Sequence, residues 1–251
     1  MLNKEDFREC EILIRVIDSY IWICREAIGE FSGRSNEEFQ TSKQKHLRIA
    51  KEVSYNRMLD SFFLLEDTQI AKKNFYEFTL TGPARYKNIG EEYLRLYGML
   101  SCYYLQRDAI FSLTRILKNP TSFKLKEQGQ ELKIVDLRNK VASHTTWHKG
   151  PKEAKQSFFI NRSSLCTKSI MLQVDGEDFE EFNIPEIVYE FENFLANSLE
   201  VVSEDLIKRL SSVDENQFTK YMGYCYNVKK MKNGEIFWDY RKPEAFINFS
   251  Y

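Results

Sequence analysis

Long segments with helical spacing of apolar residues, separated by few helix breakers, constrain this sequence most strongly. Its 251 residues include only ten glycines and five prolines, the residue types that most often mark turns. Apolar side chains recur every three or four residues over about 3–28, 37–66 and 91–117, a spacing typical of helices with one buried face. We therefore predict a mainly α-helical protein built from long helices.

The connections between these segments are expected to be irregular until a fourth helix begins. Residues 67–88 contain Thr-Gly-Pro-Ala-Arg and are predicted to form a loop. Pro120 is expected to stop the third helix. A fourth helix is predicted over either 123–144 or 131–144, because Gly129 leaves its start open.

A small β unit is predicted after the fourth helix. Around 157–183 the segments QSFFINR and SIMLQV are short and rich in strand-forming residues, and Asp175-Gly176 is a turn dipeptide. We expect two or three strands here, as a hairpin or meander appended to the helices. Pro185 is expected to be the first residue of a fifth helix, which is predicted to reach about residue 211.

One composite domain is expected rather than two, because the sequence shows no internal repeat, low-complexity tract or flexible linker. Residues 1–212 would form the helical domain with its β unit, and 213–251 a C-terminal extension packed on the same domain. Within that extension, Asn233-Gly234 suggests a further hairpin. Basic and aromatic residues are interleaved over 220–242, either as a stacking platform for unpaired bases or as a tail packed on the body.

Charge is unevenly distributed along a chain whose net charge is only −1. Residues 124–155 carry eight Lys or Arg against four acids, and residues 175–205 carry eleven acids and no base. We expect one basic and one acidic surface. The acidic run is interpreted as the exposed side of a β turn and helix, or as a contact with a basic partner or antitoxin.

The sequence predicts neither export nor a membrane location. Charged side chains begin at Lys4, so no secretion signal is expected, and Arg15 and Asp18 interrupt the most apolar early run. The five cysteines are scattered, with no Cys-x-x-Cys pair, which indicates reduced thiols rather than disulfides or a zinc site. We therefore predict a cytoplasmic protein.

The stretch DLRNKVASHTTWH, residues 136–148, places an arginine and a histidine on the apolar side of the fourth helix. On a helical wheel Arg138 lies near the middle of the apolar arc and His144 at its edge. An arginine in that position is energetically costly unless it is paired. Either Arg138 pairs with a buried acid such as Asp108, or it lines a cleft or subunit junction that receives an anionic ligand.

The order Arg-Asn-x4-His resembles the motif of the HEPN superfamily, in which an arginine and a usually polar residue precede a histidine. Arg138, Asn139 and His144 match it, and their spacing lies within the range of the family. The likeness covers about 90–145 by motif and 1–210 by helix order. It implies a long-helix bundle and a metal-independent endoribonuclease acting on RNA in a stress or defence setting. It also implies a homodimer, because the active groove of this family generally forms where two such domains meet.

The residue types suit RNA cleavage. RNA supplies its own nucleophile, the 2′-hydroxyl, so His144 would move protons and Arg138 would stabilise the charge of a phosphorane. Asn139 would bind the phosphate or orient His144. RNA-binding residues are expected around the groove, although an ordinary solvated loop is the alternative for those after the helix. They are Lys140, His148, Lys149 and Lys152.

No metal or cofactor is predicted. His144 and His148 have the i, i+4 spacing of helical zinc ligands, but no glutamate lies between them and no third ligand is evident. The near-neutral net charge leaves a second interpretation open, a non-catalytic HEPN-like module that binds a nucleotide or a protein partner. A third interpretation is a structural helical protein in which Arg138 is paired internally.

Overall fold

The computed structural model describes residues 1–30, 46–49, 52–83, 88–142, 156–165, 167–210 and 214–248. The chain groups into two compact units, and several helices have residues in both of them. Unit 1 consists of Met1–Cys10, Thr68–Leu105 and Glu127–Glu192, and unit 2 of Glu11–Asp67, Gln106–Lys126 and Asn193–Tyr251. The predicted boundary between 1–212 and 213–251 stays a prediction.

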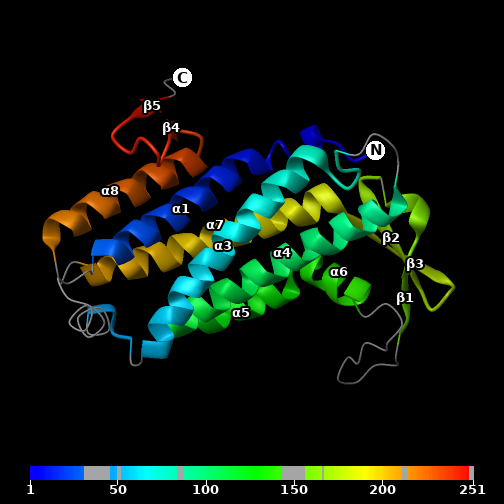
Figure 1. The fold of residues 1–251 in the computed structure, drawn as a ribbon, viewed down its shortest axis with the longest axis horizontal. Coiled ribbons are helices and arrows are strands. Elements are labelled where there is room, and N and C mark those ends of the chain that lie inside the picture. Colours follow the sequence, from blue (N-terminus) through cyan, green and yellow to red (C-terminus); the bar gives the residue numbers. More distant parts are fainter. Residues whose placement is uncertain are drawn as a thin grey trace. The chain divides into compact units, whose positions relative to one another are not determined.

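The described part of the chain is mainly helical, as predicted (Figure 1). Its α-helices are α1 (Cys10–Glu30), α3 (Glu52–Phe78), α4 (Ile89–Ile116), α5 (Ser122–Glu131), α6 (Lys133–Ala142), α7 (Ile184–Leu210) and α8 (Glu215–Lys232). Two short 3-10 helices cover Lys4–Phe7 and Arg162–Ser164. Across the described ranges, no helix is long and apolar enough to cross a lipid bilayer.

The third predicted helix is observed almost unchanged as α4, which ends shortly before Pro120. The fourth is two helices, because the chain breaks at Leu132 between α5 and α6. Both of the starts that the sequence suggested are therefore close to real helix starts, at Ser122 and Lys133.

The second predicted helix, over 37–66, is interrupted within its described part and ends later than expected. Residues 37–45 lie outside the described part, Arg48 has a left-handed backbone (φ 54°), and α3 begins at Glu52. The helix then continues to Phe78, so the predicted loop over 67–88 is wrong in its first half. The reason is that the buried side of this part of α3 is largely polar, which hides the helical pattern.

A three-stranded antiparallel sheet lies in unit 1, which confirms the predicted β unit. The strands pair in the order β1 (Phe158–Ile160), β2 (Ser169–Val174), β3 (Asp178–Asn183). Asp175 and Gly176 form the turn between β2 and β3 with left-handed backbones (φ 51° and 83°), the conformation that favours this dipeptide in a hairpin. Helix α7 begins at Ile184, so the fifth predicted helix is observed, with Pro185 as its second residue rather than its first.

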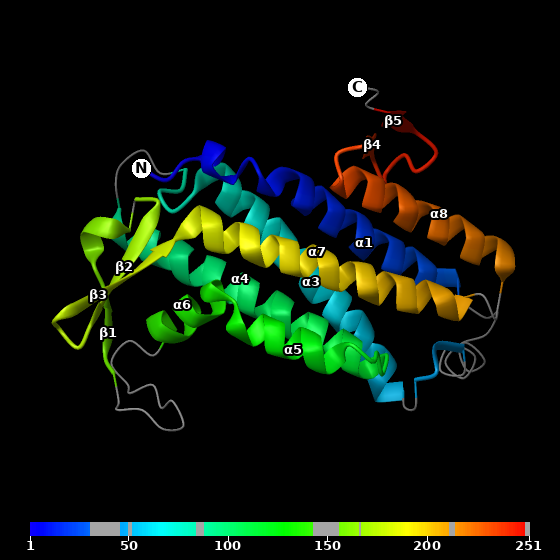
Figure 2. The same ribbon diagram turned by 180° about the vertical axis from the view of Figure 1, so that it is seen from behind.

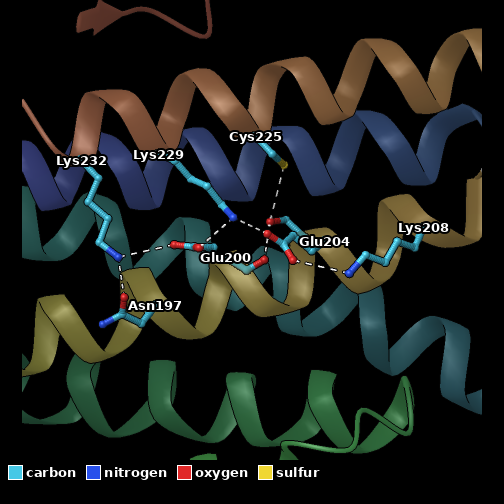
Figure 3. Close-up of polar contacts among 8 residues, drawn as sticks. Asn197, Glu200, Glu204, Lys208, Cys225, Lys229 and Lys232 are labelled. Carbon is cyan, nitrogen blue, oxygen red and sulfur yellow. Dashed lines mark hydrogen bonds and ion pairs between the residues drawn. The ribbon is translucent and has the colours of Figure 1, made fainter. Parts of the chain in front are cut away.

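In unit 2, α8 lies alongside α7 and α1 (Figures 1 and 2). Lys229 of α8 pairs with Glu200 of α7 at 3.1 Å and also with Glu204, and the Lys232 amine lies 3.5 Å from Glu200. Figure 3 shows these amines reaching the carboxylates of α7. The hydrogen bond from Lys229 lowers the pKa of Glu204, although burial opposes the shift. These ion pairs fasten α8, a helix that the sequence analysis did not predict.

Aromatic residues after residue 220 pack around Trp22 of α1. The Trp22 ring centroid lies 5.8 Å from that of Tyr224, 6.2 Å from that of Trp238 and 5.9 Å from that of Tyr240. Tyr224 and Trp238 are buried. For these rings the packing interpretation is correct, and the stacking platform is not.

A second hairpin follows α8, close to the dipeptide that suggested one. The dipeptide itself ends the helix, because Asn233 is the C-cap residue and Gly234 has a left-handed backbone (φ 74°). The hairpin then pairs β4 (Ile236–Trp238) with β5 (Phe246–Asn248) in antiparallel fashion.

Candidate functional site

Arg138 and Asn139 of the predicted motif lie on α6 in unit 1. This helix buries one apolar face, made of Ile134, Val135, Leu137 and Val141, and contacts β1. The Lys140 amine fastens α6 to the sheet, since it lies 2.6 Å from Asp136 Oδ2 and 2.7 Å from Glu180 Oε1 of β3. Burial alone would lower the pKa of Lys140, but hydrogen bonds to both carboxylates outweigh it and raise that pKa.

Arg138 is half-buried beside α4. Its guanidinium carbon lies 4.0 Å from the centroid of the Tyr104 ring, and its Nη1 donates a hydrogen bond of 3.2 Å to Asn139 Oδ1. Among the described residues, no carboxylate lies within ion-pairing distance of Arg138, and its Nε and Nη2 make no hydrogen bond. Within the described ranges, the guanidinium is thus held on one ring face and one edge, and most of its donors have no partner.

Asp108, which the sequence suggested as a buried acid for Arg138, belongs to unit 2 and is not buried. Its side chain is 45% exposed. Its Oδ1 accepts hydrogen bonds from Arg107 Nε at 3.1 Å and Nη2 at 2.7 Å. Asp108 therefore already has a cationic partner, and its description as a buried acid is wrong.

The remaining residues of the predicted site lie outside the described part of the chain. They are His144, His148, Lys149 and Lys152. The proximity of His144 to Arg138 therefore stays a prediction. Where side chains are described, no group of three His, Cys, Asp or Glu residues is placed to hold a metal ion.

The acidic run over 175–205 does not present all of its charge to solvent. Several of its carboxylates pair with basic residues: Glu180 with Lys140, Glu192 with Lys72, Glu200 and Glu204 with Lys229, and Asp205 with Arg209. The expected acidic surface is weakened accordingly, because these charges are offset within the fold.

A buried polar cluster in unit 1 was missed by the sequence analysis. Lys72 Nζ lies 2.5 Å from Glu192 Oε1, and both side chains are fully buried. Tyr76 donates its hydroxyl to the same carboxylate, and the Tyr76 and Tyr103 hydroxyl oxygens are 2.6 Å apart. Burial, reinforced by the charge of Glu192, raises the pKa of both phenols. Because its members are enclosed and bonded to one another, we assign this cluster to the core rather than to a binding site.

Comparison with protein-family models, with curated proteins and with solved structures gives no match for this chain. The resemblance to the HEPN superfamily therefore stays a prediction from Arg138, Asn139 and His144. The structure adds to this prediction the contacts that Arg138 makes on α6.

Proposed function

We propose that this chain is a metal-independent endoribonuclease of the HEPN type, with Arg138 and His144 as catalytic residues and Asn139 in support. The observation that carries the proposal is the environment of Arg138. It is half-buried on Tyr104 and tethered by Asn139, and no described carboxylate neutralises it. Such a guanidinium keeps its fork of donors for a phosphate, and partial desolvation strengthens that attraction.

Cleavage would use the 2′-hydroxyl of the RNA as the nucleophile. One histidine removes the proton from O2′, O2′ bonds to phosphorus, and the bond from phosphorus to O5′ breaks as a second histidine protonates O5′. Arg138 stabilises the added negative charge on the pentacovalent phosphorus. The products are a 2′,3′-cyclic phosphate and a 5′-hydroxyl, and neither a metal nor an electron carrier is needed.

Two histidines imply two copies of the motif, so we propose a homodimer. Each chain would contribute Arg138 and His144 to a shared groove. This arrangement would explain why a half-buried arginine lies on an apolar helix face. Closed two-fold association is also the commonest oligomeric arrangement.

The other predicted residues would hold the RNA strand. His148, Lys149 and Lys152 would supply a basic rim, whereas Lys140 would first have to leave two carboxylates. We place the enzyme in the cytoplasm, in a stress or defence response. A protein inhibitor or antitoxin would keep it silent there.

Incubation of the purified protein with mixed RNAs in EDTA tests this function. We expect cleavage by the wild type and by Arg162→Ala, which removes an exposed arginine of the same unit. Arg138→Ala and His144→Ala are expected to be inactive. Full activity of either variant, or activity that returns only with a divalent ion, would overturn the proposal.

A non-catalytic module that binds a nucleotide or a protein partner is the second candidate. The net charge of −1 favours it, because sequence-independent RNA binding relies on basic surfaces. Binding of RNA or nucleotide by the wild type with no cleavage of any RNA would support this candidate over the first.

A further inference from the structure

A charged cavity lies between α4 and α5 in unit 2, and none of the residues of the predicted site lines it. Its volume is about 360 Å³, toward the lower end of small-molecule pockets, which span roughly 300–1,000 Å³. It is lined by Asp108, Phe111, Ser112 and Arg115 of α4 and by Ser122 and Lys126 of α5. All of them belong to one continuous segment, Gln106–Lys126.

Two cations dominate this cavity. Neither Arg115 nor Lys126 pairs with a carboxylate within the described ranges. Asp108 lines the same cavity, but Arg107 Nη2 lies 2.7 Å from its Oδ1, so this pair is neutral as a unit. The cavity thus presents two positive charges that no carboxylate of the described residues offsets. They match a phosphate monoester of about −1.5 to −2 at pH 7.

The rest of the lining is suited to a sugar and a base. The second oxygen of Asp108, Oδ2, accepts from no donor in the described chain, and a carboxylate of this kind binds ribose hydroxyls in nucleotide sites. Phe111 is half-buried, with the Arg107 guanidinium 5.4 Å from its ring centroid. Its remaining ring surface lines the cavity and would stack on a base.

We propose that this cavity binds a phosphorylated ribonucleoside. The phosphate lies between Arg115 and Lys126, the ribose hydroxyls donate to Asp108, and the base contacts Phe111. Two sources carry this chemistry, a free nucleoside monophosphate and the phosphorylated 5′ end of an RNA strand. The site does not depend on cleavage at Arg138.

Isothermal titration calorimetry on the full chain tests the site, with His144→Ala as the background so that no RNA is consumed. The probes are adenosine monophosphate, its 2′-deoxy analogue, adenosine, inorganic phosphate, and one pentaribonucleotide with a 5′-phosphate or a 5′-hydroxyl. We expect the monophosphate to bind one per chain, at least tenfold more tightly than adenosine or phosphate. Arg115→Gln and Lys126→Gln should each weaken it about tenfold or more, and Asp108→Asn should remove the preference for ribose over deoxyribose.

A control variant shows whether binding depends on this cavity. Lys124→Gln changes an exposed lysine of α5 that does not line the cavity, and it should leave binding unchanged. Tighter binding of the 5′-phosphorylated strand than of the monophosphate would identify an RNA end as the source, and the reverse would identify a free nucleotide. No binding of either at millimolar concentration, or binding that survives both cavity substitutions, would overturn the proposal.

Discussion

The Arg138 guanidinium carbon lies 4.0 Å from the ring centroid of Tyr104, within unit 1. This contact shows how an arginine is accommodated on the apolar side of a helix where the described part of the chain puts no acid beside it. The ring shields one face of the cation and contributes a cation–π attraction. The donors on the edge that Asn139 does not occupy make no hydrogen bond among the described residues, and we propose that they bind a ligand.

Arg138→Ala is expected to destabilise the fold only slightly. The change removes one cation–π contact, worth about 0.5–2 kcal/mol, and also removes a partly desolvated charge. A buried ion pair broken in the same way would cost about 3–5 kcal/mol. The free energy of unfolding in urea distinguishes the loss of a cation–π contact from the loss of an ion pair, with Arg162→Ala as the control. A loss of roughly 3 kcal/mol or more would show that Arg138 serves the fold as half of an ion pair.

The parts of the fold that the sequence predicted are those with local signals. Apolar spacing and Pro120 bound α4, and the change of period with Asp175-Gly176 marks the sheet. The first half of the predicted loop over 67–88 is helical instead, and the pattern was missed because Thr68, Gln69 and Lys72 are buried yet polar. Lys72 lies in the core because it pairs with Glu192. This acid is far away in the sequence, so the local pattern around Lys72 does not contain it.

The site was predictable to a similar extent. The helical wheel put Arg138 near the middle of the apolar arc of the helix, whereas its side chain is half-buried, as those of Asn139 and Lys140 are. Tyr104 was missed as its partner, because the face of α4 that meets α6 is set by tertiary packing. The α4–α5 cavity was missed for the same reason, since its lining residues are ordinary exposed types until two helices bring them together.

Breaking the buried pair in unit 1 is expected to be costly. Lys72→Met leaves the Glu192 carboxylate buried without its cation and should cost about 3–5 kcal/mol of unfolding free energy. The double variant Lys72→Met/Glu192→Leu removes both charges and should be more stable than Lys72→Met alone. Chemical denaturation of the two variants and the wild type measures the difference. A single variant within about 1 kcal/mol of wild type would show that the pair is not enclosed in solution.

The pairing of Glu204 with Lys229 predicts a pH dependence. The pKa of Glu204 is lowered from its ordinary value of 4.5, chiefly by the hydrogen bond from Lys229. The stability from this pair is therefore fully present above pH 4.5 and is lost as pH falls through the lower, folded-state pKa. Glu204→Gln should flatten this part of the acid limb in thermal melts, whereas Glu190→Gln, at an exposed position of α7, should not. An unchanged limb in Glu204→Gln would contradict the assignment.

Association through the face that bears Arg138 is expected in solution. Sedimentation velocity should show a dimer at micromolar concentration, and Arg138→Glu should shift it toward monomer by placing unpaired acids at the seam. Arg162→Glu, which reverses an exposed charge of the same unit, is the matched control. A wild-type protein that stays monomeric throughout the micromolar range would contradict the proposal that two copies of the motif form the groove.

The most direct test of the proposed ribonuclease is the chemistry of the cut. The substrate is a pool of 2′-O-methyl oligonucleotides of randomised sequence, each with one unmodified ribonucleotide, incubated in EDTA and analysed by mass spectrometry. We predict cleavage only on the 3′ side of the ribonucleotide, leaving a 2′,3′-cyclic phosphate or its opened product and a 5′-hydroxyl, with none from Arg138→Ala or His144→Ala. Cleavage at a 2′-O-methyl position, products with a 3′-hydroxyl and a 5′-phosphate, or an intact pool would contradict it.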